Sequence, residues 1–402
     1  MASLLWGKVY YQEIFVGLLK QEPGMGSSFV YDDAYLQGQN PPIAYSLPLQ
    51  IETHTFQTEL PPFFDNLVAE GWLEEAQTRL LGKRYASRFE LLLAFGQDCA
   101  GAVSIIDPSP EKISKTLMDV EDPKEFALLT SRASLSGIQP KLAIVEKQGI
   151  YYPIKHGELS TYIAKFPSRN HYDLVANEYL TTIAYKCLLP EDTCVEMHLG
   201  NIDGFDEQAL IIKRFDRFQG KRIHFEELNQ LLNQPSNNKY DGTYQEIANF
   251  IRNTPGCLPT EIYRFYLRVL AGILLGNTDM HLKNFAMFHT TDGLRLTPAY
   301  DQVAAYLYGY KQLALSFCDI ENLPISKITA HNIIEFATSF GLNHQTIIMA
   351  IEILRKNIPN AKQAVLESTF GSEQLKQKIL ELIDQIWKET FALIGQILSQ
   401  KQ

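Results

Sequence analysis

Polar side chains are crowded into the stretch 277-NTDMHLKNF-285, which directly follows the apolar run 269-VLAGILLG-276. Another aspartate follows in 298-PAYDQ-302. Burying charged groups is costly unless they are paired or put to use. A chain that only needed to fold would gain little from this crowding, so we interpret the stretch as a functional site.

The spacing of these residues fits phosphoryl transfer. That chemistry needs a carboxylate near the attacking hydroxyl, oxygen ligands for Mg²⁺ and cations along the triphosphate. Asp279 and Asn284 show the Asp-to-Asn interval of a kinase catalytic loop, and Asp301 follows an expected strand at 294–300 that would return it to the same site. Asp279 would be the base, and Asn284 and Asp301 would bind metal. A polar loop that merely ends a helix is the competing interpretation of the Asp-to-Asn spacing.

Segments upstream could supply the remaining parts. Lys165 ends the alternating run TYIAKFP, and a helix expected at 173–188 carries Glu178, the pairing by which kinases hold a phosphate-binding lysine. The segment 134-SLSGIQPK-141 is a candidate phosphate-binding turn, or an ordinary turn. The run 211-IIKRFDRF-218 is either a hinge that contacts adenine through its backbone or a salt-bridged strand end. Taken singly, the lysine and the glutamate would more often be surface charges.

Composition limits the classes of protein that the chain can belong to. Its residues are 46% hydrophobic, which is typical of a globular protein. The length of 402 residues exceeds what one hydrophobic core usually supports, so we expect two or three domains. The net charge of −10 argues against broad direct binding of nucleic acid or anionic membranes. The five cysteines are scattered and form no C-x-x-C pair, which favours a reducing compartment. No apolar run is long enough to span a membrane, so we expect the cytoplasm.

The hydrophobic patterns divide the chain into three segments and favour an α+β fold. Residues 1–108 are β-rich, 109–217 form a small α/β lobe, and 218–402 are mostly helical. A ligand would bind between the small and the helical lobes. The expected strands lie at 8–19, 27–36, 141–147, 151–155, 161–166 and 208–215, and the expected helices lie within 74–96 and at 173–188, 261–276, 330–341 and 372–398.

Several motifs in order resemble the HipA-like serine/threonine kinases of bacterial toxin–antitoxin systems. They are VGLL, FVYDDAYL and PPFFDNLVAEG, followed by SLSGIQPKLAIV, YIAKFP, NEYL, KRFDR, GNTDMHLKNF and PAYD. The resemblance covers most of the chain. It implies a protein-kinase-like bilobal core preceded by a β-rich HipA-type domain. It also implies phosphorylation of a protein serine that depends on ATP and Mg²⁺, usually on an aminoacyl-tRNA synthetase, with growth arrest and persistence as the outcome.

The resemblance also implies roles for individual residues. Asp279 would be the catalytic base with His281 and Lys283 beside it, and Asn284 and Asp301 would be the metal ligands. His281 stands where many protein kinases have lysine, so either His281 or Lys283 would stabilise the transferred phosphoryl group. The implied nucleotide-binding residues are Ser136, Gly137, Ile138, Gln139, Lys141, Lys165, Glu178, Lys213, Arg214, Phe215, His281, Asn284 and Tyr300.

Regulation and partners follow from the same resemblance. Autophosphorylation at Ser134 or Ser136 would eject the phosphate loop, because a phosphate of about −2 charge would be repelled by the ATP phosphates. A small helix-turn-helix antitoxin would supply the DNA-binding charge that this acidic chain lacks. Two rival functions stay open: a catalytically silent co-repressor that acts through such an antitoxin, and a kinase for a lipid or small molecule, which the D-x-H-x-x-N order also suits.

Overall fold

The computed structural model describes residues 4–24, 26–108, 124, 127, 133–135, 139–155, 157–167, 171 and 173–399. The chain forms two compact units. Unit 1 comprises residues 1–168 and 196–238, and unit 2 comprises residues 169–195 and 239–402. Each unit is therefore assembled from two separate stretches of sequence. The three predicted segments divide the chain differently, and their boundaries stay a prediction.

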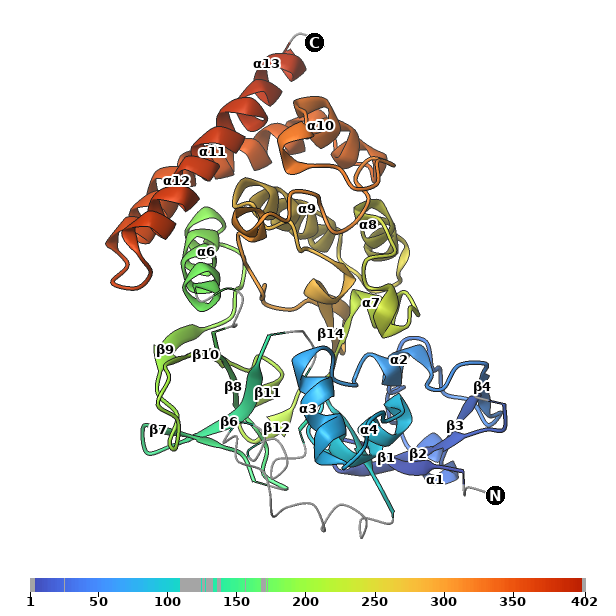
Figure 1. Cartoon of the computed structure of the whole chain (residues 1–402). Helices are drawn as coiled ribbons and strands as arrows, with labels where there is room; N and C mark the ends of the chain where they lie inside the picture. The colour runs from blue at the N-terminus through green and yellow to red at the C-terminus, as the bar shows by residue number, and fades with distance from the viewer. Residues whose placement is uncertain are drawn as a thin grey trace. The chain divides into compact units, whose positions relative to one another are not determined.

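Unit 1 begins with an antiparallel sheet whose strands lie in the order β4-β3-β2-β1-β5 (Figure 1). The strands are β1 (Trp6–Tyr11), β2 (Ile14–Gln21), β3 (Ser27–Tyr31), β4 (His54–Phe56) and β5 (Val103–Ile106). The predicted strand at 8–19 is in fact a hairpin, because Gln12 turns the chain with a left-handed φ of 55°. The predicted strand at 27–36 ends early, because the Asp32 side chain accepts the N–H of Ala34 and starts a helix.

Four helices accompany this sheet: α1 (Asp33–Gln37), α2 (Pro62–Asp65), α3 (Trp72–Leu80) and α4 (Arg88–Phe95). The last two are the helices predicted within 74–96. Helix α4 starts at a capping box, in which the Ser87 side chain accepts the N–H of Glu90 and the Glu90 carboxylate accepts the N–H of Ser87. Local sequence signals therefore set the start of this helix.

The second sheet of unit 1 is also antiparallel, in the order β7-β6-β8-β10-β9. Its strands are β6 (Lys141–Lys147), β7 (Ile150–Pro153), β8 (Tyr162–Lys165), β9 (Met197–Gly200) and β10 (Ala209–Lys213). Unit 1 continues with the short strands β11 (Arg217–Phe218), β12 (Lys221–Arg222) and β13 (Phe225–Glu227), helix α7 (Leu228–Leu231) and a 3₁₀ turn at Ser236–Asn238. The four strands predicted between residues 141 and 215 are confirmed.

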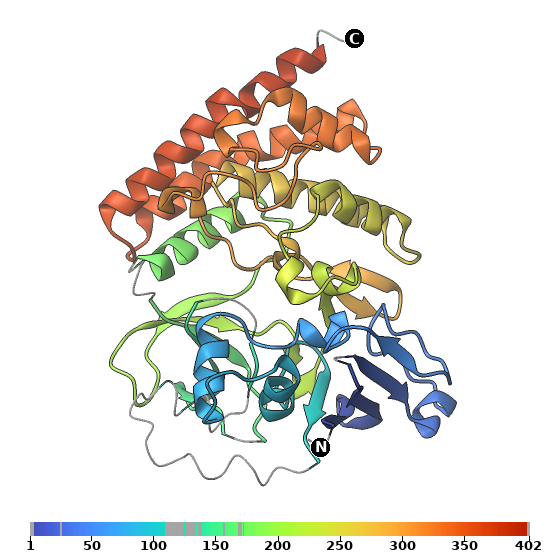
Figure 2. The same cartoon turned by 45° about the vertical axis from the view of Figure 1, so that its right-hand side comes forward.

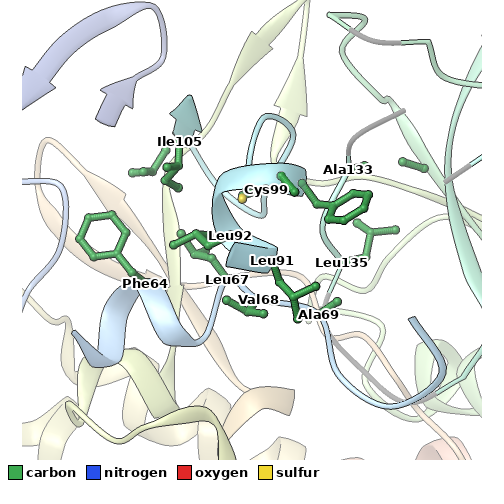
Figure 3. Packing of buried hydrophobic residues seen from close by; sticks show 14 of the residues in the cluster. Phe64, Leu67, Val68, Ala69, Leu91, Leu92, Cys99, Ile105, Ala133 and Leu135 are labelled. Carbon is green, nitrogen blue, oxygen red and sulfur yellow. The ribbon is translucent and has the colours of Figure 1, made fainter. Parts of the chain in front are cut away.

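One hydrophobic core joins the two sheets of unit 1. Side chains from the first sheet and its helices share a buried cluster with side chains from β6, β8 and β10. Figure 3 shows part of it, in which Leu91 and Leu92 of α4 pack with Val68, Ala133 and Leu135 among others. Ala133 and Leu135 immediately precede the candidate phosphate-binding residues, so this core anchors that segment at its start.

Unit 2 is mostly helical. Its helices are α6 (Leu174–Leu188), α8 (Tyr244–Asn253), α9 (Pro259–Leu274), α10 (Ala330–Ser339), α11 (His344–Glu367), α12 (Glu373–Glu389) and α13 (Ile394–Ser399). Helix α6 packs along α11, as Figures 1 and 2 show, and α9 contacts α6, α8 and α12. A hairpin of β14 (Ala286–Thr290) and β15 (Gly293–Leu296) follows the candidate catalytic loop. Among the helices of the described ranges, none is both long and apolar enough to cross a bilayer.

The C-terminal helices differ from the prediction in two ways. The predicted helix at 372–398 is broken at Thr390, whose hydroxyl donates to the Ile328 carbonyl at 3.0 Å. Helix α11 was not among the predicted helices, and it contains Pro359 in its interior. Proline lacks an N–H and usually interrupts a helix, so packing against α6 outweighs the local preference here.

Candidate active site

The polar stretch at 277–285 begins where α9 ends. Gly276 follows the helix with a left-handed φ of 70°. The N–H of Gly276 donates to the Ile273 carbonyl at 3.1 Å. The N–H of Asn277 donates to the Gly272 carbonyl at 2.8 Å. These two bonds form a Schellman motif, which requires a residue that tolerates positive φ at the position of Gly276. The motif sets the direction in which the polar stretch leaves the helix.

Hydrogen bonds within the stretch close it into a compact loop. The N–H of His281 donates to the Asp279 carbonyl at 2.8 Å, and the Asn284 side-chain nitrogen donates to the same carbonyl at 2.6 Å. The His281 Nδ1 accepts the N–H of Lys283 at 3.2 Å. The amide nitrogen of Asn284 therefore takes part in closing the loop. Its Oδ1 is not used in that bond, and this is the atom by which an amide binds metal ions.

The segment that carries Asp301 is tied to this loop. The Tyr300 hydroxyl donates to the Lys283 carbonyl at 2.8 Å, and the Asn277 side chain lies 3.4 Å from the Asp301 carbonyl oxygen. Asp301 itself has a left-handed φ of 51°. That conformation is unfavourable for a residue with a Cβ, and such strain is concentrated at functional sites. Unit 2 thus brings together Asp279, Asn284 and Asp301, as the sequence predicts.

The pKa of the Asp279 carboxylate is raised by the protein atoms and charges around it. The residue stays accessible to solvent, yet the protein atoms packed around its carboxylate raise its pKa to about 6. The Asp301 carboxylate adds to this rise, whereas a hydrogen bond from Tyr240 and the charge of Lys239 oppose it. Asp279 and Asp301 therefore interact, and the pKa of Asp279 lies close to that of a useful general base.

Sequence reasoning missed Lys239 and Tyr240. The Tyr240 hydroxyl donates to Asp279 Oδ1 at 3.2 Å. The backbone carbonyl of Lys239 accepts the N–H of Leu282 at 3.1 Å. No motif or spacing in 239-KYDG-242 points to the loop, because the contact is made only by the fold.

Unit 1 holds the predicted phosphate-binding lysines side by side. Lys141 opens β6 and Lys165 closes β8, and the two are direct partners in the antiparallel ladder. Directly opposed residues share one face of a sheet, and two like charges there repel each other. Both lysines are buried. The two lysines are thus neighbours on one face of the sheet, and their contact with phosphate stays a prediction.

The predicted phosphate loop is only partly described. Ser136, Gly137 and Ile138 lie outside the described residues. The Gln139 side-chain nitrogen donates to the Phe166 carbonyl at 2.8 Å, which extends the contact between the β6 and β8 segments. Ser134 is buried and its hydroxyl donates to the Leu67 carbonyl at 2.8 Å.

The predicted hinge residues have three different surroundings. Lys213 is exposed and pairs with Glu196, whereas Phe215 packs edge-on against Phe225 at 5.0 Å. Arg214 is buried, and its side chain binds only protein groups. These groups are the Asp216 carboxylate, the Asp98 carboxylate, the Ser160 hydroxyl and the Cys99 carbonyl. The side chains of Lys213 and Arg214 thus form ion pairs, as the interpretation of a salt-bridged strand end predicts. A backbone contact with adenine stays a prediction.

Glu178 is fully buried on α6 in unit 2. Lys165, its predicted partner, belongs to unit 1. Their pairing therefore stays a prediction.

The fold has a clear counterpart among solved structures. The structure of the Shewanella oneidensis toxin–antitoxin complex of HipA, HipB and operator DNA contains a chain that matches with a TM-score of 0.77 and 21% identity. The match covers 96% of this chain and 99% of that chain. This likeness, with the mixed sheet and helix content, defines an α+β protein with a protein-kinase-like core, and the predicted fold class is confirmed.

The family is established by sequence. The family model of the HipA N-terminal domain matches residues 7–106, and that of the HipA-like C-terminal domain matches residues 133–362. The second match covers more than half of the chain, so the chain belongs to the HipA-like family of kinase toxins, and the predicted resemblance is confirmed.

Curated relatives match along nearly their whole length. The serine/threonine-protein kinase toxin HipA of Shewanella oneidensis is 25% identical over 403 residues, which is 91% of this chain and 90% of that protein. Y4dM of Sinorhizobium fredii, described by name as a kinase candidate, is 26% identical over 382 residues, 89% of this chain and 90% of its own.

Proposed function

We propose that the chain is a serine/threonine protein kinase that uses Mg²⁺ and ATP and acts as the toxin of a toxin–antitoxin pair. The observation that carries this proposal is the cluster of Asp279, Asn284 and Asp301 in unit 2. The bonds from Tyr300 and Asn277 hold the Asp301 segment against the catalytic loop, and membership of the HipA-like family gives the cluster its context.

The donor set fits Mg²⁺. Asn284 Oδ1 and the Asp301 carboxylate are hard oxygen ligands of the kind that this ion prefers. Two interacting carboxylates, of which Asp279 has a raised pKa, are a place where added positive charge is stabilising. Asn284 and Asp301 would hold the ion, and Mg²⁺ when bound neutralises negative charge on the triphosphate.

Asp279 would act as the base. With a pKa of about 6 its carboxylate is mostly ionised at neutral pH, so it can accept the proton of a serine hydroxyl as that oxygen attacks the γ-phosphorus of ATP. The bond between the γ-phosphorus and the oxygen bridging to the β-phosphate breaks, and ADP leaves. Either His281 or Lys283 would stabilise the phosphoryl group, and Lys141 and Lys165 of unit 1 would bind phosphates.

The target and the partner rest on relatives. The related Shewanella oneidensis protein is named a serine/threonine-protein kinase toxin, and the matching structure contains HipB and operator DNA. We infer an antitoxin of the helix-turn-helix class for this chain, with DNA reached only through it. The expected substrate class is an aminoacyl-tRNA synthetase, whose phosphorylation would arrest translation.

Autophosphorylation would switch the kinase off. Ser134 is buried with its hydroxyl bound to the Leu67 carbonyl, so it can accept phosphate only after leaving that position. Ser136 is the other candidate. Phosphopeptide mapping after incubation with Mg²⁺ and ATP would distinguish them, and finding no phosphate on either serine would refute this switch.

A transfer assay tests the kinase itself. Three purified proteins would each receive ATP labelled in the γ-phosphate, with and without a bacterial lysate: wild type, Asp279→Asn and the control Asp241→Asn. The control changes an exposed aspartate that follows Tyr240 directly in the sequence. We expect label on the protein or on one lysate band, reduced about 10²- to 10⁴-fold in Asp279→Asn only. ATP binding without transfer in wild type would support the silent co-repressor. Label in extracted lipid or small molecules alone would support the lipid or small-molecule kinase.

A further inference from the structure

The segment at Lys239 and Tyr240 lies against the proposed catalytic loop at 277–285. None of the sequence motifs contains these two residues. The Lys239 carbonyl accepts the N–H of Leu282, which lies between His281 and Lys283. This backbone bond fixes the segment relative to the loop, so the side chain of Tyr240 is held at a defined position beside Asp279.

Tyr240 contacts two of the predicted catalytic groups at once. Its hydroxyl donates to Asp279 Oδ1 at 3.2 Å. Its ring stands edge-on to the His281 imidazole, with the ring centroids 5.1 Å apart and the planes at 86°, a favourable geometry for aromatic pairs. A single side chain thereby restrains both the carboxylate and the imidazole.

Two further features set the surroundings of Tyr240. Lys239 is buried, and its Nζ lies 5.5 Å from the centre of the Tyr240 ring, within the range of a cation–π contact. Tyr240 itself is 44% exposed. The ring is therefore partly covered by a charged and an aromatic neighbour, and part of the residue stays exposed to solvent.

We propose that Tyr240 positions the Asp279 carboxylate for the acceptor serine and forms the acceptor-binding surface next to that serine. This proposal rests on the proposed kinase function and names a residue that the motifs do not contain. A carboxylate can rotate about its bond to Cβ, and only one of its oxygens can face the serine hydroxyl. By binding Oδ1, the Tyr240 hydroxyl leaves Oδ2 to accept the serine proton, and such orientation contributes to rate.

The two parts of the proposal need different substitutions. Tyr240→Phe removes the hydroxyl and keeps the ring, so it tests the orientation of Asp279. Tyr240→Ala removes the ring as well, so it tests contact with the acceptor. Tyr310→Phe is the matched control, because Tyr310 is 63% exposed and contacts the same loop through its backbone carbonyl, which accepts the Thr278 hydroxyl at 2.7 Å.

Steady-state transfer from labelled Mg²⁺–ATP to dephosphorylated casein, used as a generic serine acceptor, would be measured for the full chain. The rate of autophosphorylation would be the second readout. We expect Tyr240→Phe to lower kcat about 5- to 10-fold with the KM for ATP unchanged. Tyr240→Ala should also raise the KM for casein several-fold, and Tyr310→Phe should match wild type.

The outcomes separate this proposal from the proposed function. Wild-type kcat in Tyr240→Phe, or an equal loss in Tyr310→Phe, overturns the role of Tyr240 while the kinase stands, provided that Asp279→Asn is inactive. A loss in Tyr240→Phe that follows a lower melting temperature, with both KM values unchanged, means a structural role only and also overturns it. Wild type that labels neither itself nor casein, like Asp279→Asn, refutes the kinase and the proposal with it.

Discussion

Two clusters of charged side chains differ in how fully each compensates its own charge. In unit 1, Asp98 and Asp216 are buried between the guanidinium groups of Arg214 and Arg217. In unit 2, Asp279 interacts with a second carboxylate, that of Asp301. In the first cluster two carboxylates face two guanidinium groups, whereas in the second a carboxylate repels Asp279 and Lys239 and Tyr240 oppose that effect.

The pKa values of the two clusters move in opposite directions. Burial alone would raise the pKa of Asp98, but Arg214, Arg217 and the more peripheral Arg222 hold it below its usual value. At Asp279 burial raises the pKa to about 6 and Asp301 adds to the rise. Removing one partner of a buried ion network is costly, whereas carboxylates with raised pKa values cluster at functional sites. This contrast leads to three predictions about stability.

Breaking the closed cluster should have the largest effect. Asp98→Ala leaves the buried guanidinium groups of Arg214 and Arg217 to share the Asp216 carboxylate, and removing one partner of a buried network costs about 3–5 kcal/mol. Urea unfolding measures the loss. The control is Glu196→Ala, which breaks the exposed pair with Lys213 and should cost less than about 1 kcal/mol. An equal cost for both substitutions would contradict the distinction between the clusters.

Relieving the open cluster should stabilise the protein, in a way that depends on pH. The folded-state pKa of Asp279, about 6, lies above the ordinary value of 3.8, so the ionised carboxylate destabilises the folded state above about pH 6. The shift corresponds to about 3 kcal/mol, and solvent screening at this accessible side chain reduces the expected gain in Asp279→Asn to about 1 kcal/mol.

The pH profile gives the test of that gain. In EDTA, the gain should be present at pH 7.5, diminish as the pH falls from 6 to 4, and vanish below 4, where the carboxylate is protonated in folded and unfolded chains alike. Asp241→Asn should show no such profile. A variant less stable than wild type at pH 7.5 would contradict a raised pKa of Asp279 in the folded chain.

The smallest effect concerns the backbone of Asp301. Its φ of 51° suits glycine better than any residue with a Cβ. Asp301→Gly and Asp301→Ala remove the same carboxylate, so their difference reports the backbone alone. We expect the glycine variant to be more stable than the alanine variant by about 1 kcal/mol in thermal unfolding, with both inactive. Equal stability would mean that the backbone relaxes at this position.

The sequence predicts the elements better than their ends and their partners. Alternation and helical spacing found strands β6, β7, β8 and β10 of the second sheet and helices α6, α9 and α10, because their apolar residues recur at regular intervals. Strand β9 of that sheet was not predicted. The hairpin at Gln12 and the break at Thr390 were missed, since single residues decide them. Helix α11 was missed because its stability comes from packing against α6, which overrides the local effect of Pro359.

The candidate site divides in the same way. Asp279, Asn284 and Asp301 follow from spacing, because a short loop and a hairpin return the chain to the same place. Tyr240 could not be found, since it lies 39 positions from Asp279 and meets it only through the fold. Arg214 illustrates the converse: this basic residue in a promising run binds Asp216, two positions on, and also Asp98, which no motif connects to it.

The interleaved order of the two units along the chain has a consequence for synthesis and for cutting. Helix α6 is made before strands β9 and β10 of unit 1, and its partner α11 is made more than 150 residues later. The side of α6 that packs on α11 therefore leaves the ribosome long before α11 can cover it. For the same reason no single cleavage can separate the two units with both of them whole, because a stretch of each lies between the two stretches of the other.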